Sequence, residues 1–234
     1  VLASGGIAQG PEVEAFEQEF SAAAARGAHC VAVNSGTSAQ HLAMLAAGIG
    51  PADEVLVPSF TFAATANSVA LTGATPVFVD IDAETFCMSV ASARSAITER
   101  TKAIMPVHLY GHPADLVGLL ELCQEFGLAL IEDAAQAHLA SVDGRFVGTW
   151  GLAGSFSFYP TKNLGAVGDA GAVITSDSEI ANKVRSLGSY GAVAGDKPRH
   201  TSLGWNSRLD PIQAAVLRVN LRLLDSWIVD RRRI

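Results

Sequence analysis

Residues 34–38 (Asn-Ser-Gly-Thr-Ser) join a predicted strand to a predicted helix and carry side chains suited to binding an anion. A glycine and hydroxyl residues at a helix start offer backbone N–H groups, side-chain donors and the positive end of the helix dipole, which together suit a phosphate. The same residues also suit an ordinary N-cap, with Thr37 or Ser38 capping its own helix. They match neither a Walker A loop nor a Gly-x-Gly-x-x-Gly motif, which argues against nucleotide-dependent phosphotransfer and Rossmann dinucleotide binding.

Glu132 and Asp133 stand at the end of an almost wholly apolar run. A carboxylate there is either exposed and paired with a nearby Lys or Arg, or desolvated and dependent on a cation or strong hydrogen-bond donors. In open α/β sheets, ligands bind outside the carboxyl ends of the strands. The second alternative would therefore mark a ligand site.

Lys162 follows a segment of aromatic residues and a proline, residues 155–161. Most lysines lie in solvated loops, but a lysine in special surroundings can act as a nucleophile or bond to an aldehyde. The nearby Gly165, Gly168 and Gly171 would either let a ligand approach closely or serve as turn residues. A phosphate cradle, a strand-end carboxylate and a lysine together match pyridoxal 5'-phosphate (PLP), because its phosphate, ring nitrogen and aldehyde need these partners.

The elements that must position these residues follow an alternating pattern. Short β-prone runs at 29–33, 54–57, 75–79, 103–107 and 128–131 alternate with helical patterns that end near Ala47 and Leu71 or cover 89–97 and 115–126. A first amphipathic helix is predicted at 11–26. Strands that alternate with helices predict an α/β domain with a largely parallel sheet.

The pattern changes after Gly144. Residues 153–158 and 171–175 predict two strands close in sequence, as in an antiparallel pair, and helices are expected at 179–187 and 208–227. Residues 188–204 form the longest stretch without a predicted element. Loops of that length in a compact domain are often functional or mobile.

Composition narrows the class of protein. The 234 residues include 16 Lys and Arg against 23 Asp and Glu, a net charge of −7, which disfavours nucleic acid and anionic membranes as partners. No apolar run is long enough to span a membrane, and no signal peptide is recognisable. The three cysteines form no Cys-x-x-Cys pair and the histidines no ligand spacing, so we expect no metal site, buried free thiols and a cytoplasmic location.

Five segments, in order along the chain, resemble the DegT/StrS family of nucleotide-sugar aminotransferases. They are residues 34–38, 58–62 (Pro-Ser-Phe-Thr-Phe), 132–138 (Glu-Asp-Ala-Ala-Gln-Ala-His), 157–163 (Ser-Phe-Tyr-Pro-Thr-Lys-Asn) and 206–210 (Asn-Ser-Arg-Leu-Asp). The resemblance implies the large domain of a fold-type-I PLP-dependent transferase, with a mostly parallel mixed sheet flanked by helices. It also implies an N-terminal helical segment at 1–27, a PLP-binding domain at 28–207, and a helix at 208–234 leading to a small C-terminal domain largely absent from this chain.

The same resemblance implies a role for individual residues. Lys162 would carry the cofactor and move a proton, and Asp133 would keep the pyridine nitrogen protonated. The other cofactor contacts would be Gly36, Thr37, Ser38 and Ser157 at the phosphate, Phe62 on the ring face, Gln136 near the ring hydroxyl, and Asn206 reaching the phosphate of the neighbouring subunit in a homodimer. Arg208 is expected to brace its loop, and plain apolar packing could also account for Phe62.

Lys162 also separates the reactions that the resemblance allows. Dehydratases of the family carry His in place of the lysine, so Lys162 favours transfer of an amino group from an amino acid, with glutamate the expected donor, to a nucleotide-linked keto sugar. A PLP-dependent sugar dehydratase and a non-catalytic regulatory relative remain alternatives. Residues 206–210 resemble members that act at C3 of the sugar and residues 60–65 those that act at C4, which leaves the position open.

Overall fold

The computed structural model describes residues 1–193 and 196–233 and shows an α/β fold built on one seven-stranded sheet. The strands are β1 (His29–Val33), β2 (Glu54–Pro58), β3 (Thr75–Val79), β4 (Thr101–Ile104), β5 (Ala129–Asp133), β8 (Ala153–Ser157) and β9 (Gly171–Thr175). Their order across the sheet is β1-β9-β8-β5-β4-β2-β3. Neighbouring strands pair in parallel except at β9, which is antiparallel to both β1 and β8. The predicted mostly parallel sheet and the predicted antiparallel pair are both confirmed.

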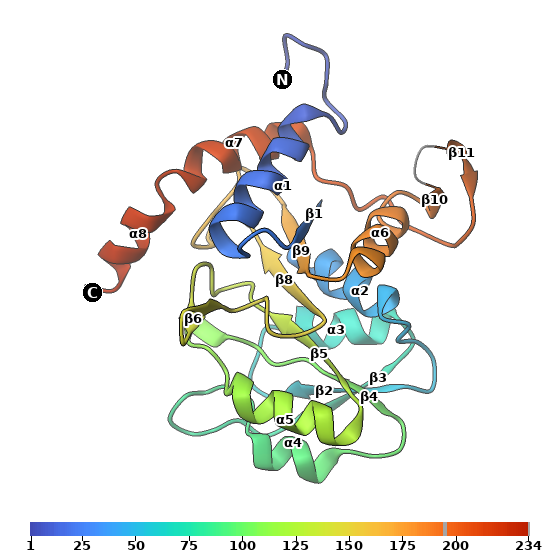
Figure 1. Cartoon of the computed structure of the whole chain (residues 1–234), viewed down its shortest axis with the longest axis vertical. Helices are drawn as coiled ribbons and strands as arrows, with labels where there is room; N and C mark the ends of the chain where they lie inside the picture. Colours follow the sequence, from blue (N-terminus) through green and yellow to red (C-terminus); the bar gives the residue numbers. More distant parts are fainter. Residues whose placement is uncertain (194–195, 234) are drawn as a thin grey trace.

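Helices cover both faces of this sheet (Figure 1). The helices are α1 (Pro11–Ala24), α2 (Gly36–Ala46), α3 (Ala64–Leu71), α4 (Val90–Ala96), α5 (Leu116–Phe126), α6 (Ser178–Leu187), α7 (Pro211–Leu221) and α8 (Leu224–Arg231). Buried side chains of α2, α3 and α6 form one core, and those of α1, α4, α5 and α7 form the other. Helices α1 to α6 therefore each bury one apolar stripe against the sheet, as their sequence period predicts, whereas α7 packs on α1 and α8 follows α7.

The C-terminal part corrects the prediction of a single helix at 208–227. The structure has two helices, and the first begins at Pro211, because proline lacks an N–H group and suits the first position of a helix. Between the helices, the N–H of Leu223 donates to the carbonyl of Asn220, three residues back, which tightens and interrupts the helical turn. Helix α8 projects from the body of the molecule, at the left of Figure 1.

Two hairpins were missed in the sequence. Strands β6 (Ser141–Val142) and β7 (Arg145–Phe146) pair around an Asp-Gly turn whose two residues both have positive φ, the conformation of a tight hairpin loop. Strands β10 (Ala192–Val193) and β11 (Asp196–His200) form a second antiparallel pair within 188–204, where no element was predicted. Of that predicted loop, residues 194–195 lie outside the described residues, as does residue 234 of the predicted last segment.

The topology brings strand ends together at one edge of the sheet. Strands β1, β5 and β8 point the same way, and β9, which runs against them, begins where they end. Helix α1 packs along α7, so the first and last predicted segments lie side by side (Figure 1). The boundaries 1–27, 28–207 and 208–234 stay a prediction. Among the described residues, the model has no helix with both the length and the apolarity that a membrane crossing requires.

Candidate active site

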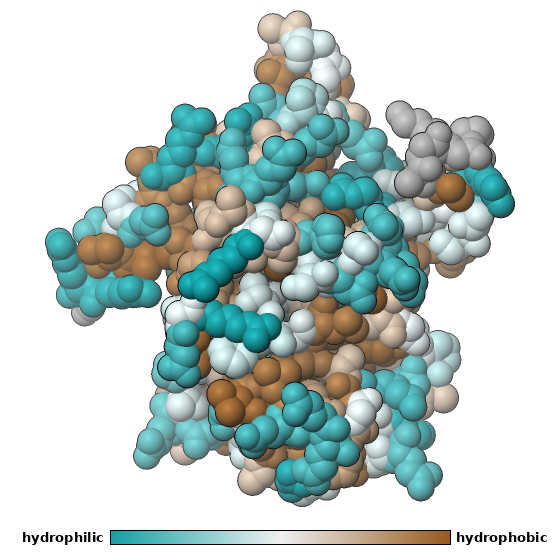
Figure 2. Space-filling view, in the orientation of Figure 1, coloured by the Kyte–Doolittle hydropathy of each residue, from teal (hydrophilic) through white to brown (hydrophobic). Residues whose placement is uncertain are grey.

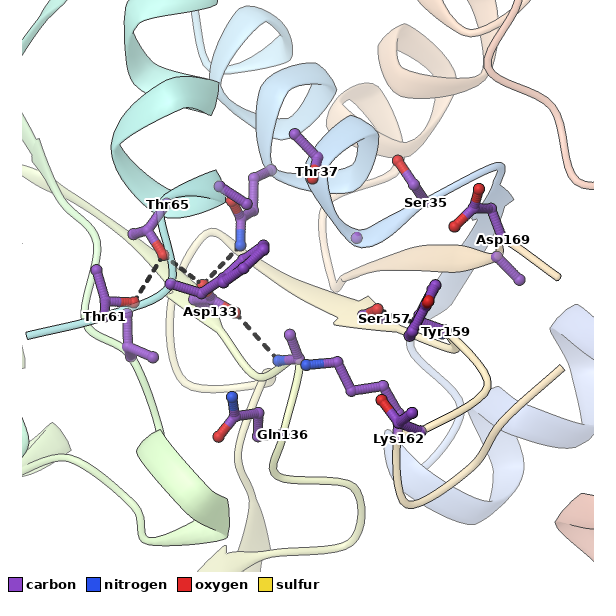
Figure 3. Close-up of a pocket in the computed structure, with 18 residues that line it drawn as sticks. Ser35, Thr37, Thr61, Thr65, Asp133, Gln136, Ser157, Tyr159, Lys162 and Asp169 are labelled. Atoms are coloured by element: carbon purple, nitrogen blue, oxygen red, sulfur yellow. Dashed lines mark hydrogen bonds between the residues drawn. The ribbon is translucent and has the colours of Figure 1, made fainter.

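A pocket of about 370 Å³ opens at the carboxyl edge of the sheet (Figure 3). It brings together the three segments singled out in the sequence. Its lining includes Ser35, Gly36, Thr37, Gln40, Thr61, Phe62, Thr65, Asp133, Gln136, Ser157, Tyr159, Lys162 and Asp169. The lining thus holds seven of the residues predicted to bind or act on a cofactor, at the ends of β5 and β8, at the start of α2 and on the loops that follow β2, β5 and β8.

One end of the pocket is formed where the start of α2 meets the end of β8. A Cβ on Gly36 would lie 2.7 Å from the Cβ of Ser157, so the two segments approach as closely as a glycine allows. Ser35, and not Thr37 or Ser38 as considered above, caps the helix: its Oγ accepts from the N–H of Ser38 at 3.0 Å. The hydroxyl of Thr37 and the free N–H groups of the first helical turn remain available for a phosphate.

Asp133 lies on the floor of the pocket and is only 5% exposed. Its Oδ2 accepts from Gln40 Nε2 at 2.6 Å and from Thr65 Oγ1 at 2.9 Å, and its Oδ1 accepts from the N–H of Ala135 at 3.1 Å. Burial raises the pKa of this carboxyl, while the hydrogen bonds from Ala135 and Thr65 and the charge of Lys162 act in the opposite direction. The exposed ion pair with Lys or Arg is therefore the wrong alternative.

Glu132, the adjacent carboxylate, has a structural role. It is fully buried, and its oxygens accept from the backbone N–H groups of Gly148, Trp150 and Gly151 at 2.6–2.8 Å. His108 Nδ1 accepts from the N–H of Ala114, so the ring proton is on Nε2, 3.1 Å from Glu132 Oε2. Two neighbouring acidic residues on one strand thus have different roles: Asp133 faces the pocket, and Glu132 supports a turn.

Lys162 extends into the pocket toward Asp133 in Figure 3. Gln136 accepts from the N–H of Tyr110 through Oε1 at 2.8 Å, which leaves its amide N–H₂ free to donate. Phe62 lines the pocket with 73% of its surface exposed, so packing in the core does not account for this aromatic side chain. An exposed ring at a pocket offers a face for stacking.

Some predicted residues lie elsewhere. Ser38 is not in the described lining, and its hydroxyl accepts from Ser35 Oγ at 3.0 Å. Asn206 is exposed outside this pocket, and its backbone carbonyl accepts from the side-chain amide of Asn34. The assignments of Ser38 and Asn206 to cofactor binding stay predictions.

The three glycines near Lys162 do not line the pocket. A Cβ on Gly165 would clash with the carbonyl of Pro160, and one on Gly171 would clash with the backbone of Ser35. A Cβ on Gly168 would lie 2.8 Å from the side-chain amide of Gln213. They let protein segments approach one another, and the alternative that they also admit a ligand stays a prediction.

Several pocket residues had been given no individual role from the sequence, namely Ser35, Gln40, Thr61, Thr65, Tyr159 and Asp169. For Gln40 a signal existed: it is a polar residue on a helix whose neighbours are mostly Ala, Leu and Met. Within the part of the chain that the structure describes, no group of three or more His, Cys, Asp and Glu residues could hold a metal ion.

Histidines contribute little to the pocket. His108 and His138 lie outside the helices and strands, and both are buried. His138 packs against the rings of Phe20, Phe156 and Phe158, and burial lowers its pKa to about 3. Arg208 lies over the ring of Tyr190 at 5.3 Å, in agreement with the expected bracing of its loop.

The residues present fit PLP on the chemistry of their donors and acceptors. A buried carboxylate with three hydrogen-bond donors and a raised pKa suits a protonated pyridine nitrogen, which would supply the missing cation. A helix start offers N–H groups to a phosphate, and a lysine amine lies in the same pocket.

Known proteins resemble the chain over its whole length. The model of the DegT/DnrJ/EryC1/StrS aminotransferase family matches residues 1–234. The chain is 52% identical to the erythromycin biosynthesis sensory transduction protein EryC1 of Saccharopolyspora erythraea, over 97% of this chain and 61% of that protein. It is 51% identical to the dTDP-3-amino-3,4,6-trideoxy-alpha-D-glucose transaminase of Streptomyces venezuelae, over 97% of this chain and 59% of that protein.

Solved structures agree with these relatives. The crystal structure of S. venezuelae DesV in complex with a ketimine intermediate superposes with a TM-score of 0.92 at 50% identity, over 96% of this chain and 60% of that one. NtdA of Bacillus subtilis, solved with bound cofactor PMP, superposes with a TM-score of 0.90 at 35% identity, over 96% and 51%. The chain thus spans about 60% of the length of EryC1, of the S. venezuelae transaminase and of the DesV chain. With its pocket, its sheet order and a match from end to end, the chain belongs to the DegT/DnrJ/EryC1/StrS aminotransferase family.

Proposed function

We propose that this chain is the cofactor-binding part of a PLP-dependent aminotransferase that moves an amino group from an amino acid to a nucleotide-linked keto sugar. The observation that carries the proposal is the convergence of Lys162, Asp133 and the junction of Gly36 with Ser157 on one pocket. The names of relatives about 50% identical to the chain support the reaction class.

The chemistry divides between the cofactor and the protein. PLP, when bound, supplies an electron sink for the carbon that carries the amino group. Asp133 holds a negative charge at the ring nitrogen, and its buried position makes that charge more effective than it would be in water. The Nζ of Lys162 would hold the cofactor at its aldehyde carbon, with loss of water. Once the amine of the amino donor displaces it there, the free Nζ would move a proton between the two carbons that exchange the amino group.

The remaining predicted contacts would orient the cofactor. Gly36, Thr37, Ser38 and Ser157 would hold the phosphate at the start of α2. The N–H of Ser38 already donates to Ser35 Oγ, so Ser38 would contribute the proton of its hydroxyl, which accepts from Ser35. Phe62 would stack on the ring face, which accounts for its exposure. The free amide N–H₂ of Gln136 would donate to the ring hydroxyl.

The proposal also includes a homodimer, a further small domain and a cytoplasmic location. An exposed Asn206 suits a homodimer in which this residue reaches the neighbouring cofactor phosphate. Leu223, just before helix α8, and Val229 within it are each 47% exposed. Hydrophobic atoms gather on this helix in Figure 2, which supports a helix leading into a further small domain. All three cysteines are free and buried, as expected for a reducing cytoplasm.

The names of relatives support a nucleotide-linked sugar as the substrate. The name of the S. venezuelae transaminase specifies a 3-amino sugar, which favours C3 over C4 as the position of the keto group. Glutamate remains the expected donor.

The test uses the full-length protein loaded with PLP. Glutamate should bleach the visible band of the cofactor, a C3 keto sugar on a nucleoside diphosphate should restore it, and a Lys162→Ala variant should do neither. PLP binding without turnover on any keto sugar would support the non-catalytic alternative. A deoxysugar product without amino transfer would support the dehydratase.

A further inference from the structure

Gln40 is a buried polar residue that the proposed reaction does not use. It lies one turn after Gly36 on α2 and is only 2% exposed. Its neighbours on the same helix, Ala39, Leu42 and Ala43, are fully buried in an apolar core. An amide buried among apolar side chains is costly unless both of its ends are hydrogen-bonded, so this glutamine needs an explanation.

Both ends of the amide have partners. Nε2 donates to Asp133 Oδ2 at 2.6 Å, and Oε1 accepts from the hydroxyl of Ser68 at 3.0 Å. An ionised carboxylate only accepts hydrogen bonds, so the end of the amide that faces Asp133 must be the N–H₂ group. Ser68 is fully buried on α3, and its one hydroxyl proton lies within reach of both Oε1 of Gln40, at 3.0 Å, and the carbonyl of Thr65, at 2.9 Å. The contact with Asp133 therefore sets the orientation of the amide, and Ser68 supports it.

Gln40 donates to the carboxylate of Asp133, which faces the pocket. Oδ2 of Asp133 accepts from both Gln40 and Thr65, whereas Oδ1 accepts from a backbone N–H. Gln40 and Thr65 also line the same pocket as Asp133. A donor at 2.6 Å on a buried carboxylate favours its ionised form and limits its rotation.

We propose that Gln40, supported by Ser68, is a positioning residue that holds the Asp133 carboxylate ionised and aimed at the ring nitrogen of the cofactor. The inference rests on the proposed function, because it requires a pyridine ring in this pocket. Gln40 acts through Asp133 and not on the reacting atoms. Its loss should weaken the interaction of the protein with the ring nitrogen and leave the phosphate contacts unchanged.

The test compares two ligands that differ at one atom. Pyridoxamine phosphate and its analogue with C–H in place of the ring nitrogen are titrated by calorimetry into the cofactor-free, full-length protein. Gln40→Leu removes the donor at nearly constant volume. We expect about tenfold weaker binding of pyridoxamine phosphate, the effect of one hydrogen bond to a charged group, and an unchanged affinity for the analogue.

Two further variants keep the test decisive. Ser68→Ala leaves Gln40 in place but removes a partner of its amide, so it should shift the ratio of the two affinities in the same direction by less. It also carries the test if Gln40→Leu does not fold. Thr175→Val is the matched control, since it removes a buried hydroxyl hydrogen-bonded to the carbonyl of Leu152, outside the pocket lining. It should leave both affinities unchanged.

Each outcome has one meaning. If the wild-type protein does not bind pyridoxamine phosphate, the proposed function fails, and the inference falls with it. If the wild type binds and Gln40→Leu binds both ligands as the wild type does, only the inference is wrong. If Gln40→Leu loses both ligands equally, Gln40 merely packs the pocket, and the inference is again overturned.

Discussion

Gly36→Ala tests the close approach that builds one end of the pocket. A methyl group at this position would lie 2.7 Å from the Cβ of Ser157 and 3.2 Å from its Cα. Carbon atoms in contact normally stand about 3.5–4.0 Å apart, so α2 and β8 must separate by roughly 1 Å. Overpacking of this kind costs about 1–3 kcal/mol. The better helix propensity of alanine, at most about 1 kcal/mol in a helix interior, recovers part of that cost.

The assay is urea unfolding combined with PLP titration of the same preparations. We expect a lower free energy of unfolding by about 1–2 kcal/mol, the difference of the two effects, and weaker PLP binding because the helix start moves away from the phosphate. Gly168→Ala is the control. Its methyl group would meet only the flexible amide of Gln213 at 2.8 Å, so the change should stay within about 0.5 kcal/mol. If Gly36→Ala keeps wild-type stability and wild-type PLP affinity, the close approach of Gly36 to Ser157 does not build the phosphate end of the pocket.

Three buried groups give further predictions. Because burial lowers the pKa of His138 to about 3, folding excludes a proton that the unfolded chain binds below its pKa near 6.5, so stability falls as the solution becomes more acidic. Between pH 7 and pH 5 the wild type should lose about 2 kcal/mol relative to His138→Phe in urea unfolding, and equal losses would contradict this. Burial raises the pKa of Asp133, so its ionisation costs stability as the pH rises through the folded-state pKa. Asp133→Asn should therefore make the cofactor-free protein at least as stable as the wild type at pH 7 while weakening PLP binding; a less stable variant with full affinity would be the opposite result. Glu132→Leu leaves several buried N–H groups without an acceptor and should cost at least about 3 kcal/mol in the same assay, whereas a loss below about 1 kcal/mol would show that Glu132 does not support the turn.

The sheet was predictable because its strands are short apolar runs bounded by turn residues. The predicted ranges of β1, β3 and β9 match the structure to the residue. Strands β1 and β9 are almost wholly buried, whereas β3 is an edge strand with partly exposed side chains, so its range followed from the turn residues around it. The division between α7 and α8 was not predictable from period alone, because the interrupted turn lies in a stretch without Pro or Gly. The hairpin at β6 and β7 had a readable signal, its Asp-Gly turn.

The candidate site was predictable as far as local motifs reach. Asp133 and Lys162 stand at positions that strand ends and an aromatic segment single out, and the topology brings them into one pocket. The strand pattern alone did not decide whether Asp133 or Glu132 faces that pocket, because neighbouring residues on a strand point to opposite faces, and the choice of Asp133 came from the family resemblance. The contact of Gln40 with Asp133 joins residues 93 positions apart, which no local pattern encodes.

We expect the Nζ of Lys162 to bond to PLP in this pocket. Borohydride reduction of the PLP-loaded protein, followed by digestion and mass spectrometry, reads this bond directly. We expect one pyridoxyl-labelled peptide, which contains Lys162, and no label in the Lys162→Ala protein. Label on Lys102 or Lys183 in place of Lys162, or no label at all on protein saturated with PLP, would contradict it.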